Sequence, residues 1–203
     1  MFPYAKVWCM SPKKASTTGK PSVQRLSRQD WVEAALRTLN VGGLAGLSIE
    51  RLAIELGATK GSFYWHFKDR SALIEATLDE WERRDTDQLI ERASTMEEPR
   101  ERLRWLFHVV FSEKAAVGID TALLADADSP IVAAALERVA ASRLSYIEAQ
   151  FKLMGMDAAS DRAMLTYTAF VGLAQLRRTS PDLTPRGRRS TRYLSNITEW
   201  LLG

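Results

Sequence analysis

Residues 59–70, which read TKGSFYWHFKDR, carry the side chains with which proteins contact nucleic acid. They include two aliphatic hydroxyl groups, three cations, a tyrosine, a tryptophan and a histidine. Cations and hydroxyl groups bind phosphate oxygens, and lysine also reaches the O6 and N7 atoms of guanine in the major groove. A tryptophan ring can touch a thymine methyl group or a sugar edge. The segment therefore predicts recognition of a polyanion.

On a helix with about 100° per residue, this segment has two faces of opposite character. Phe63 and Phe67 fall together and are predicted to pack against the preceding helices. The other half presents Gly61, whose missing side chain admits a sugar–phosphate backbone. Trp65 fits a DNA contact and sideways packing on the domain equally well, and His66 fits a phosphate contact or a place in the scaffold. The segment is predicted to be core on one side and contact surface on the other.

The surrounding sequence predicts a helix-turn-helix unit. A first helix is expected over residues 28–40, ended by the glycines of VGG. Ser48 is the expected N-cap of the next helix, IERLAIEL, and Thr59 the cap of a third helix after the break GAT. Asp69 is expected to cap a longer fourth helix. In such a unit the second short helix lies in the DNA major groove, with its N-terminal residues facing base edges.

The candidate DNA-contacting residues are the cations, hydroxyl groups, helix starts and exposed rings of this unit. They are Arg28, Ser48, Thr59, Lys60, Gly61, Ser62, Tyr64, Trp65, His66, Lys68 and Arg70. The charge distribution agrees, since residues 1–70 hold 11 Lys and Arg against 5 Asp and Glu, whereas residues 71–203 hold 17 against 20. A chance imbalance in a basic tail is the alternative, because four of the eleven cations precede Pro21.

Helical periodicity continues to the end of the chain and predicts an all-α protein of about nine helices. The dipeptide Ser129-Pro130 predicts the start of a long helix that reaches about Met154. Its predicted apolar face is Leu136, Ala140, Leu144, Ile147 and Phe151. Two further long helices are expected over residues 158–178 and at the C-terminus.

Composition gives little support to catalysis, metal binding or membrane insertion. The chain has two histidines and one cysteine, Cys9, and lacks catalytic serine or phosphate-binding glycine motifs, so no enzyme, cofactor or metal site is predicted. Asp126 and Asp128 in ADADSP are interpreted as caps of a helix end. No apolar run approaches the roughly 20 residues needed to cross a bilayer, and the N-terminus has no continuous apolar stretch typical of a secretory signal. A cytoplasmic protein is expected.

Residues 28–74 resemble the DNA-binding domain of the tetracycline-repressor (TetR) family. The resemblance rests on the ordered series Trp31-Val32, Ala34-Ala35, Gly43, Ser48, Gly57, Tyr64, His66-Phe67 and Arg70. Two positions depart from the usual pattern. Arg70 stands where the family usually has lysine, and Leu47-Ser48 stands where it usually has a Ser/Thr pair.

The resemblance implies a homodimeric regulator that binds a palindromic operator in double-stranded DNA. It implies three regions: a flexible basic tail (1–24), a helix-turn-helix DNA-binding domain (25–70) and a helical regulatory and dimerisation domain (71–203). Lys20, Arg25 and Arg28 form an arm that either touches the minor groove or is disordered. The last two helices would pair as a four-helix bundle. The predicted dimer residues are Leu173, Leu176, Ile197, Trp200 and Leu201.

The resemblance further implies a ligand cavity in the second domain, filled by a small-molecule effector that shifts the fourth helix and releases the DNA. The candidate lining residues are Trp105, His108, Phe111, Tyr146, Tyr167 and Phe170, with ordinary core packing as the alternative. His108 is the expected polar anchor. Arg104 and Arg143 are assigned to solvated faces in preference to an acidic effector. A DNA-binding regulator controlled by a protein partner, or by no ligand, is the alternative interpretation.

Overall fold

The computed structural model describes residues 26–112 and 119–203, and within these ranges the chain is helical and contains no β-strand. Its helices are α1 (Arg28–Gly46), α2 (Ile49–Glu55), α3 (Lys60–Phe63), α4 (Arg70–Glu82), α5 (Gln88–Ser94), α6 (Pro99–Phe111), α7 (Ile119–Leu123), α8 (Pro130–Leu153), α9 (Ala159–Thr179) and α10 (Arg188–Leu202). The all-α prediction is confirmed. The predicted tail (1–24) lies outside the described residues, and so does Arg25 of the predicted arm.

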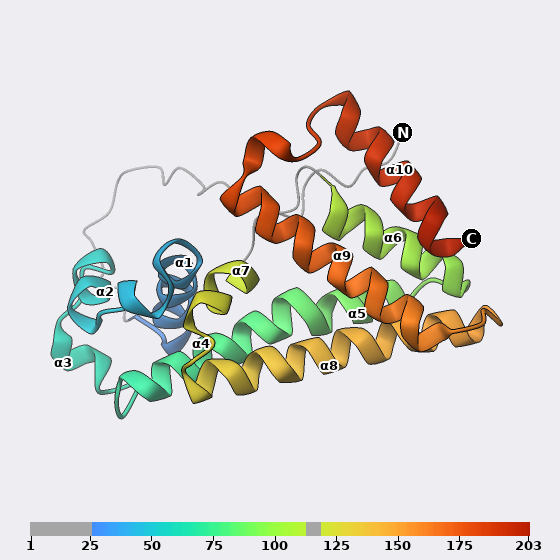
Figure 1. Cartoon of the computed structure of the whole chain (residues 1–203). Helices are drawn as coiled ribbons and strands as arrows, with labels where there is room; N and C mark the ends of the chain where they lie inside the picture. The colour runs from blue at the N-terminus through green and yellow to red at the C-terminus, as the bar shows by residue number, and fades with distance from the viewer. Residues whose placement is uncertain (1–25, 113–118) are drawn as a thin grey trace, which may run out of the picture.

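A π-helical turn, η1 (Arg83–Asp87), joins α4 to α5 without a break. Its backbone stays in the right-handed helical region at both ends, and the N–H of Gln88 donates to the carbonyl of Arg83, five residues back. A single rod therefore runs over residues 70–94, from the short helices α2 and α3 to the far part of the molecule (Figure 1). Counting the rod once gives nine helices in the described residues.

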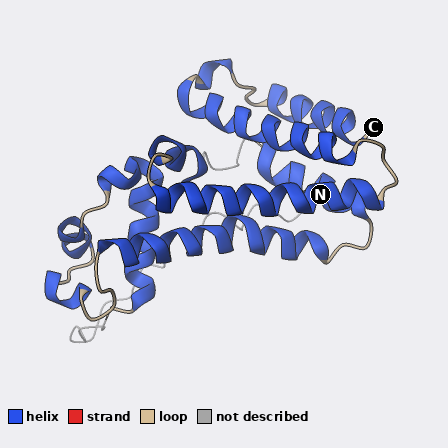
Figure 2. Cartoon of the chain, turned by 60° about the horizontal axis from the view of Figure 1, so that its bottom comes forward, coloured by secondary structure: helices blue, strands red, loops and turns tan. Residues whose placement is uncertain are grey.

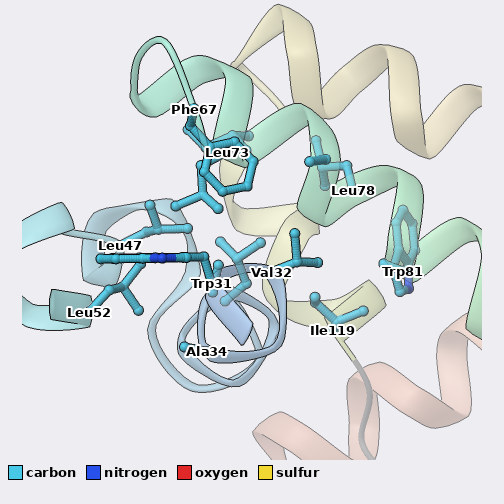
Figure 3. Packing of buried hydrophobic residues seen from close by; sticks show 14 of the residues in the cluster. Trp31, Val32, Ala34, Leu47, Leu52, Phe67, Leu73, Leu78, Trp81 and Ile119 are labelled. Atoms are coloured by element: carbon cyan, nitrogen blue, oxygen red, sulfur yellow. The ribbon is translucent and has the colours of Figure 1, made fainter. Parts of the chain in front are cut away.

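The first hydrophobic core joins the helix-turn-helix unit to the rod, to α7 and to the N-terminal half of α8. Trp31, on α1, and Trp81, on α4, are both completely or nearly completely buried in it. Figure 3 shows this cluster, in which Ile119 of α7 completes the packing around Val32 of α1. The core therefore extends across the boundary at residue 70 that the sequence suggested, so α4 belongs to both parts of the molecule.

The second hydrophobic core lies between α6, the C-terminal half of α8, α9 and α10. Helices α8 and α9 pack along each other, α6 packs on both of them, and α10 packs on α6 (Figures 1 and 2). Its fully buried rings are Phe107, Phe111 and Phe151. No described helix combines the length and the apolar character that crossing a bilayer requires.

Two helix predictions needed correction. Helix α1 continues past Asn40 to Gly46, with a kink at Gly43, where φ is +57°. On α8 the buried residues are Val132, Ala135, Val139, Gln150 and Phe151. Of the predicted face, only Phe151 is fully buried, because α8 packs first on α4 and α7 and then on α6 and α9, so its buried face changes along the helix.

Candidate DNA-binding surface

The helix-turn-helix unit is built by the predicted caps. Ser48 accepts a hydrogen bond from the N–H of Arg51, and Thr59 accepts one from Ser62, so each hydroxyl begins a helix. Between them, Gly57 has φ +63°, its N–H donates to the carbonyl of Ile54, and the next N–H, of Ala58, donates to Ala53 at 2.8 Å. This is the glycine-ended helix terminus that fixes a tight turn.

The predicted division of residues 59–70 into two faces is confirmed. Phe63 and Phe67 are buried and stack on each other with ring centres 5.4 Å apart, and the Trp31 ring meets Phe63 edge-on. On the opposite side, Tyr64 is 53% exposed and Trp65 is 88% exposed. Trp65 therefore does not pack sideways on the domain in this chain, and both rings are available to a partner.

The regular part of α3 is shorter than the sequence suggested. It covers Lys60–Phe63, and a turn follows over residues 64–66. The N–H of Phe67 still donates to the carbonyl of Phe63 at 3.0 Å, so the two phenylalanines keep their four-residue spacing on one face. Lys60, Gly61, Tyr64, Trp65 and Lys68 are all exposed, in contrast to the two buried phenylalanines.

Several candidate residues at the edge of this surface have partners within the chain. The Arg28 guanidinium lies 4.8 Å from the centre of the Phe67 ring, which places a cation beside the turn. His66 is half-buried, and its charge helps to hold the pKa of Asp30 below its usual range, after the larger effect of hydrogen bonds from Ser27. The Ser62 hydroxyl donates to the carbonyl of Thr59 at 2.9 Å.

Arg70 has a structural role that the sequence did not reveal. Its Nε donates to the carbonyl of Leu47 at 2.9 Å, and its Nη2 donates to the carbonyl of Leu44 at 2.6 Å. These carbonyls end α1 and lead into α2, so Arg70 joins the start of the rod to the end of α1. The predicted phosphate contact competes with these two bonds.

Glu50 is part of this surface and was missed by sequence reasoning. Its Oε1 lies 2.6 Å from the Lys60 Nζ, and its Oε2 accepts a hydrogen bond from the Ser48 hydroxyl at 3.0 Å. The hydrogen bond from Lys60 is the main reason why the pKa of Glu50 falls to about 2. The sequence signal that could have identified this ion pair is the presence of opposite charges in the first turns of two successive short helices. Ser48 and Lys60, which were both predicted to contact phosphate, therefore both donate to the carboxylate of Glu50.

The candidate effector residues do not form one group. Phe111 is buried and meets Phe170 edge-on, and Phe170 lies beside Tyr167 with ring centres 6.3 Å apart. Trp105 instead faces Arg92 of α5, and the Tyr146 hydroxyl accepts a hydrogen bond from Ser94. His108 is exposed, so the prediction that it anchors a ligand inside the protein is wrong.

Arg143 is largely covered, with 13% of its side chain exposed, which corrects its assignment to a solvated face, whereas Arg104 is exposed as predicted. The Arg143 Nη1 lies 2.6 Å from Asp120 of α7, its Nε donates to Thr86 at 2.9 Å, and its Nη2 donates to the carbonyl of Asp85. No sequence pattern indicated this, because all three partners lie on other helices. Arg143 therefore connects α7, α8 and the π-helical turn.

Around Arg143 lie aromatic rings and one carboxyl group without a hydrogen bond to any described residue. The guanidinium is 5.7 Å from the centre of the Phe170 ring and 5.9 Å from that of Trp81, whose buried Nε1 also lacks a partner among these residues. Burial, and then the charge of Asp120, raises the pKa of the Asp85 carboxyl to about 6. We call Asp85, Asp120, Arg143 and their aromatic neighbours the Arg143 cluster.

A hollow of about 350 Å³ lies elsewhere, near the end of α10. Its lining includes Arg100, Met154 and Met156, and none of the candidate effector residues.

In the described ranges no three His, Cys, Asp or Glu side chains gather as metal ligands do. Asp126 does not cap its own helix as predicted, because its carboxylate accepts a hydrogen bond from Leu44 of α1.

The predicted dimer residues divide into two groups. Leu173, Ile197 and Leu201 are buried in the second core of the single chain, so they are not free to contact a partner. Leu176 and Trp200 remain exposed, Trp200 by 73%. On α9, Met164 and Leu165 are also exposed, and the sequence reasoning did not select them.

Comparison with known proteins agrees with this geometry. Residues 32–77 match the family model described as bacterial regulatory proteins, tetR family. The tetracycline repressor protein class D of Escherichia coli is 42% identical over 52 residues, which are 26% of this chain and 24% of that protein. The regulator TtgR of Pseudomonas putida is 33% identical over 90 residues, 43% of this chain and 42% of its own. The matches to the tetracycline repressors thus span about a quarter of their length.

Solved structures resemble nearly the whole chain in fold. The reduced form of NemR from E. coli matches with a TM-score of 0.70 at 16% identity, covering 86% of this chain and 94% of that one. FadR of Bacillus subtilis, solved in complex with stearoyl-CoA, matches with a TM-score of 0.67 at 10% identity, covering 87% and 98%. At these identities the likeness concerns the fold alone.

Proposed function

Because the chain belongs to the tetR family of bacterial regulatory proteins, we propose that it is a sequence-specific DNA-binding transcriptional regulator. The observation that carries the proposal is the two-faced segment 59–67. Phe63 and Phe67 hold it in the core, while Lys60, Gly61 and Tyr64 present a cation, a close-approach point and a hydroxyl group to the outside. That combination suits a segment inserted in a major groove.

We propose that the regulator acts as a homodimer on a palindromic operator. Support comes from the exposed apolar side chains on α9 and α10, which include Leu165, Leu176 and Trp200. Leu165 and Leu176 are separated by about three helical turns and so lie on one face of α9. Pairing of two such faces would bury them, and two-fold symmetry would set two recognition segments against the two halves of a palindrome.

We further propose that the protein is a repressor and that a small-molecule effector releases it from the operator. The support is the Arg143 cluster, in which the rod carries a carboxyl group and an indole N–H that have no hydrogen bond to any described residue, with Arg143 and the Phe170 ring beside them. The complex of the related fold of B. subtilis FadR with stearoyl-CoA is a precedent for a ligand in this architecture. Control by a protein partner, or by no ligand, is the alternative.

Two connections would carry a change at the cluster to the DNA-binding unit. The rod itself runs from η1 to Arg70, next to α3. In addition, the segment of α7 and the 3₁₀ turn η2 (Leu124–Asp126) contacts Arg143 through Asp120 and α1 through Asp126. A ligand that separates Asp120 from Arg143 would thereby move α1 and the rod, and change the spacing of two recognition segments in a dimer.

The deciding experiment is selection of bound fragments from random duplex DNA by the purified protein, before and after unfolding and refolding to remove any carried ligand. We expect an enriched palindrome whose half-sites are centred about 34–36 Å apart, or a multiple of it. Absence of any enriched sequence from both preparations would contradict the proposed function. A thermal-shift screen of small molecules then separates control by an effector from control by a protein partner or by no ligand. Repeated stabilisation of the protein by one chemical class supports a ligand site.

A further inference from the structure

We propose that Glu50 and Lys60 act together as a reader of one G·C base pair in each operator half-site, which makes Glu50 a specificity-determining residue. The inference rests on the proposed function and extends it to a residue that neither sequence reasoning nor the family pattern selected. It starts from the ion pair of 2.6 Å between Lys60 Nζ, on α3, and Glu50 Oε1, on α2.

The position of Glu50 is unusual for a surface that binds phosphate. It occupies the second residue of α2, close after the N-cap Ser48, where free N–H groups would otherwise favour an anion such as phosphate. Its carboxylate is held there by Lys60 and by the Ser48 hydroxyl. A fixed negative charge at this point repels the DNA backbone, so the start of α2 is disfavoured as a general phosphate site.

The Glu50 carboxyl group is ionised at neutral pH. Hydrogen bonds from Lys60 and from its own backbone N–H lower the pKa of its carboxyl group to about 2. An ionised carboxylate only accepts hydrogen bonds. In the major groove the donors that it can use are the base amino groups, and the cytosine N4 amino group is the one that glutamate pairs with.

Lys60 supplies the complementary half of the contact. A carboxylate contacting cytosine N4 has the O6 and N7 acceptors of the paired guanine beside it, and lysine donates to these atoms. Lys60 Nζ lies next to Glu50 in the free protein, with both side chains more than half exposed, so the pair already presents a donor and an acceptor side by side. Thymine in the place of cytosine would turn its O4 acceptor to the carboxylate, and the adenine paired with it would bring an N6 amino donor beside Lys60.

Two alternatives assign Glu50 a weaker role. A solvated ion pair that merely stabilises the turn would leave sequence preference unchanged when it is removed. A pair that opens on binding, with Lys60 moving to phosphate, would make Glu50 an inhibitor of all DNA binding without regard to sequence. The three cases differ in one measurable quantity, the base preference at a single position of each half-site.

The test compares DNA selection by the wild-type protein and by Glu50→Gln, with Glu55→Gln as the matched control. Glu55 lies on the same helix and forms an exposed ion pair of 2.7 Å with Arg37, so its substitution removes the same charge from α2 without touching Lys60. Glutamine pairs with adenine N6 and N7, so we expect Glu50→Gln to lose the G·C preference at one position per half-site and accept A·T there.

The expected change at that position is about tenfold in relative affinity, and random DNA should bind more tightly to Glu50→Gln than to wild type. Glu55→Gln should select the wild-type motif. An unchanged motif for Glu50→Gln, with or without a general rise in affinity, would overturn the inference while leaving the proposed function intact. Failure of the wild-type protein to select any sequence would instead remove the proposed function, and this inference with it.

Discussion

The carboxylate of Asp126 lies 2.7 Å from the backbone nitrogen of Leu44 and accepts its hydrogen bond. The two residues are far apart in sequence and belong to η2 and to the kinked end of α1. The contact requires a residue without a side chain at position 43, because a Cβ at Gly43 would lie 2.5 Å from the same carboxylate oxygen. At φ +57° and ψ −161° the position also has a backbone conformation nearly restricted to glycine.

Replacing Asp126 with alanine should therefore loosen the connection between η2 and α1. We expect a loss of about 1–2 kcal/mol in the free energy of unfolding, since the Leu44 N–H is left partly buried without a partner. Urea unfolding followed by circular dichroism measures it. The substitution Asp128→Ala is the control, because Asp128 is exposed and its carboxylate accepts no hydrogen bond from another described residue.

Gly43→Ala should destabilise the protein by at least about 2 kcal/mol, from backbone strain and from the approach to Asp126. In the Asp126→Ala background the same change should cost about 1 kcal/mol less, because the clashing oxygen is gone. Urea unfolding of the two single variants and the double variant gives this coupling energy. Strictly additive effects would show that the contact does not constrain α1.

Arg70 should matter for folding more than for phosphate binding. Arg70→Ala removes two hydrogen bonds to the carbonyls of Leu44 and Leu47, and we expect it to lower the free energy of unfolding by about 2 kcal/mol. Lys68→Ala removes an exposed cation and should leave stability within about 0.5 kcal/mol of wild type. A large change in the salt dependence of DNA binding for Arg70→Ala would identify it as a phosphate contact instead.

Lys60→Ala and Tyr64→Phe should weaken binding to the selected operator without lowering stability, since both side chains are exposed. Binding measured against salt concentration should have a steep negative log–log slope, about −0.9 for each phosphate neutralised. The Lys60 change should alter sequence preference more than slope if the lysine reads a base. A loss of stability in either variant would show that the side chain supports the fold, and the weaker binding could then not be assigned to a lost DNA contact.

The Asp85 carboxyl should make stability depend on pH. Its folded pKa of about 6 lies above the ordinary aspartate value of 3.8, so between these values the folded state binds more protons than the unfolded state. Its contribution is therefore fully present below about pH 4, falls as pH rises to about 6 and is flat above that. The groups that act on it are Asp120, which raises the pKa, and Arg143 and Arg84, which lower it.

The variant Asp85→Asn keeps the shape of the side chain and cannot ionise. Relative to wild type, we expect it to gain about 1–3 kcal/mol in the free energy of unfolding between pH 4 and pH 7. Urea unfolding of both proteins over this pH range isolates the effect, since other carboxyl groups titrate in both. A difference that stays constant with pH would show that Asp85 is ionised throughout.

The helix-turn-helix unit could be predicted almost completely from the sequence because its signals are local. Ser48, Thr59 and Asp69 each cap the helix that begins after them, and Gly57 ends α2, so three to five neighbouring residues determine each boundary. The four-residue spacing of Phe63 and Phe67 was enough to separate core from surface. The family resemblance rested on these same residues.

The parts that could not be predicted depend on contacts between distant segments. Arg143 looks like an ordinary helix-surface cation until Asp120 and Thr86 are brought to it from other helices. Arg70 looks like a phosphate ligand because its acceptors are backbone carbonyls, which leave no trace in the sequence. Leu173 and Ile197 carry the apolar character expected of an interface, and only the packing shows that the chain buries them itself.

The π-helical turn in the rod changes which way its second half faces. A turn closed by a bond over five residues holds one more residue than an α-helical turn, and each extra residue rotates the remainder of the helix by about 100°. Deleting one residue from 83–87 would therefore leave α4 and the DNA-reading surface in place while turning α5 by more than a quarter of a circle. Arg92 would leave Trp105, and Ser94 would leave Tyr146. A gain or loss of one residue at this turn would therefore let one end of the rod keep its packing while the other end meets different partners.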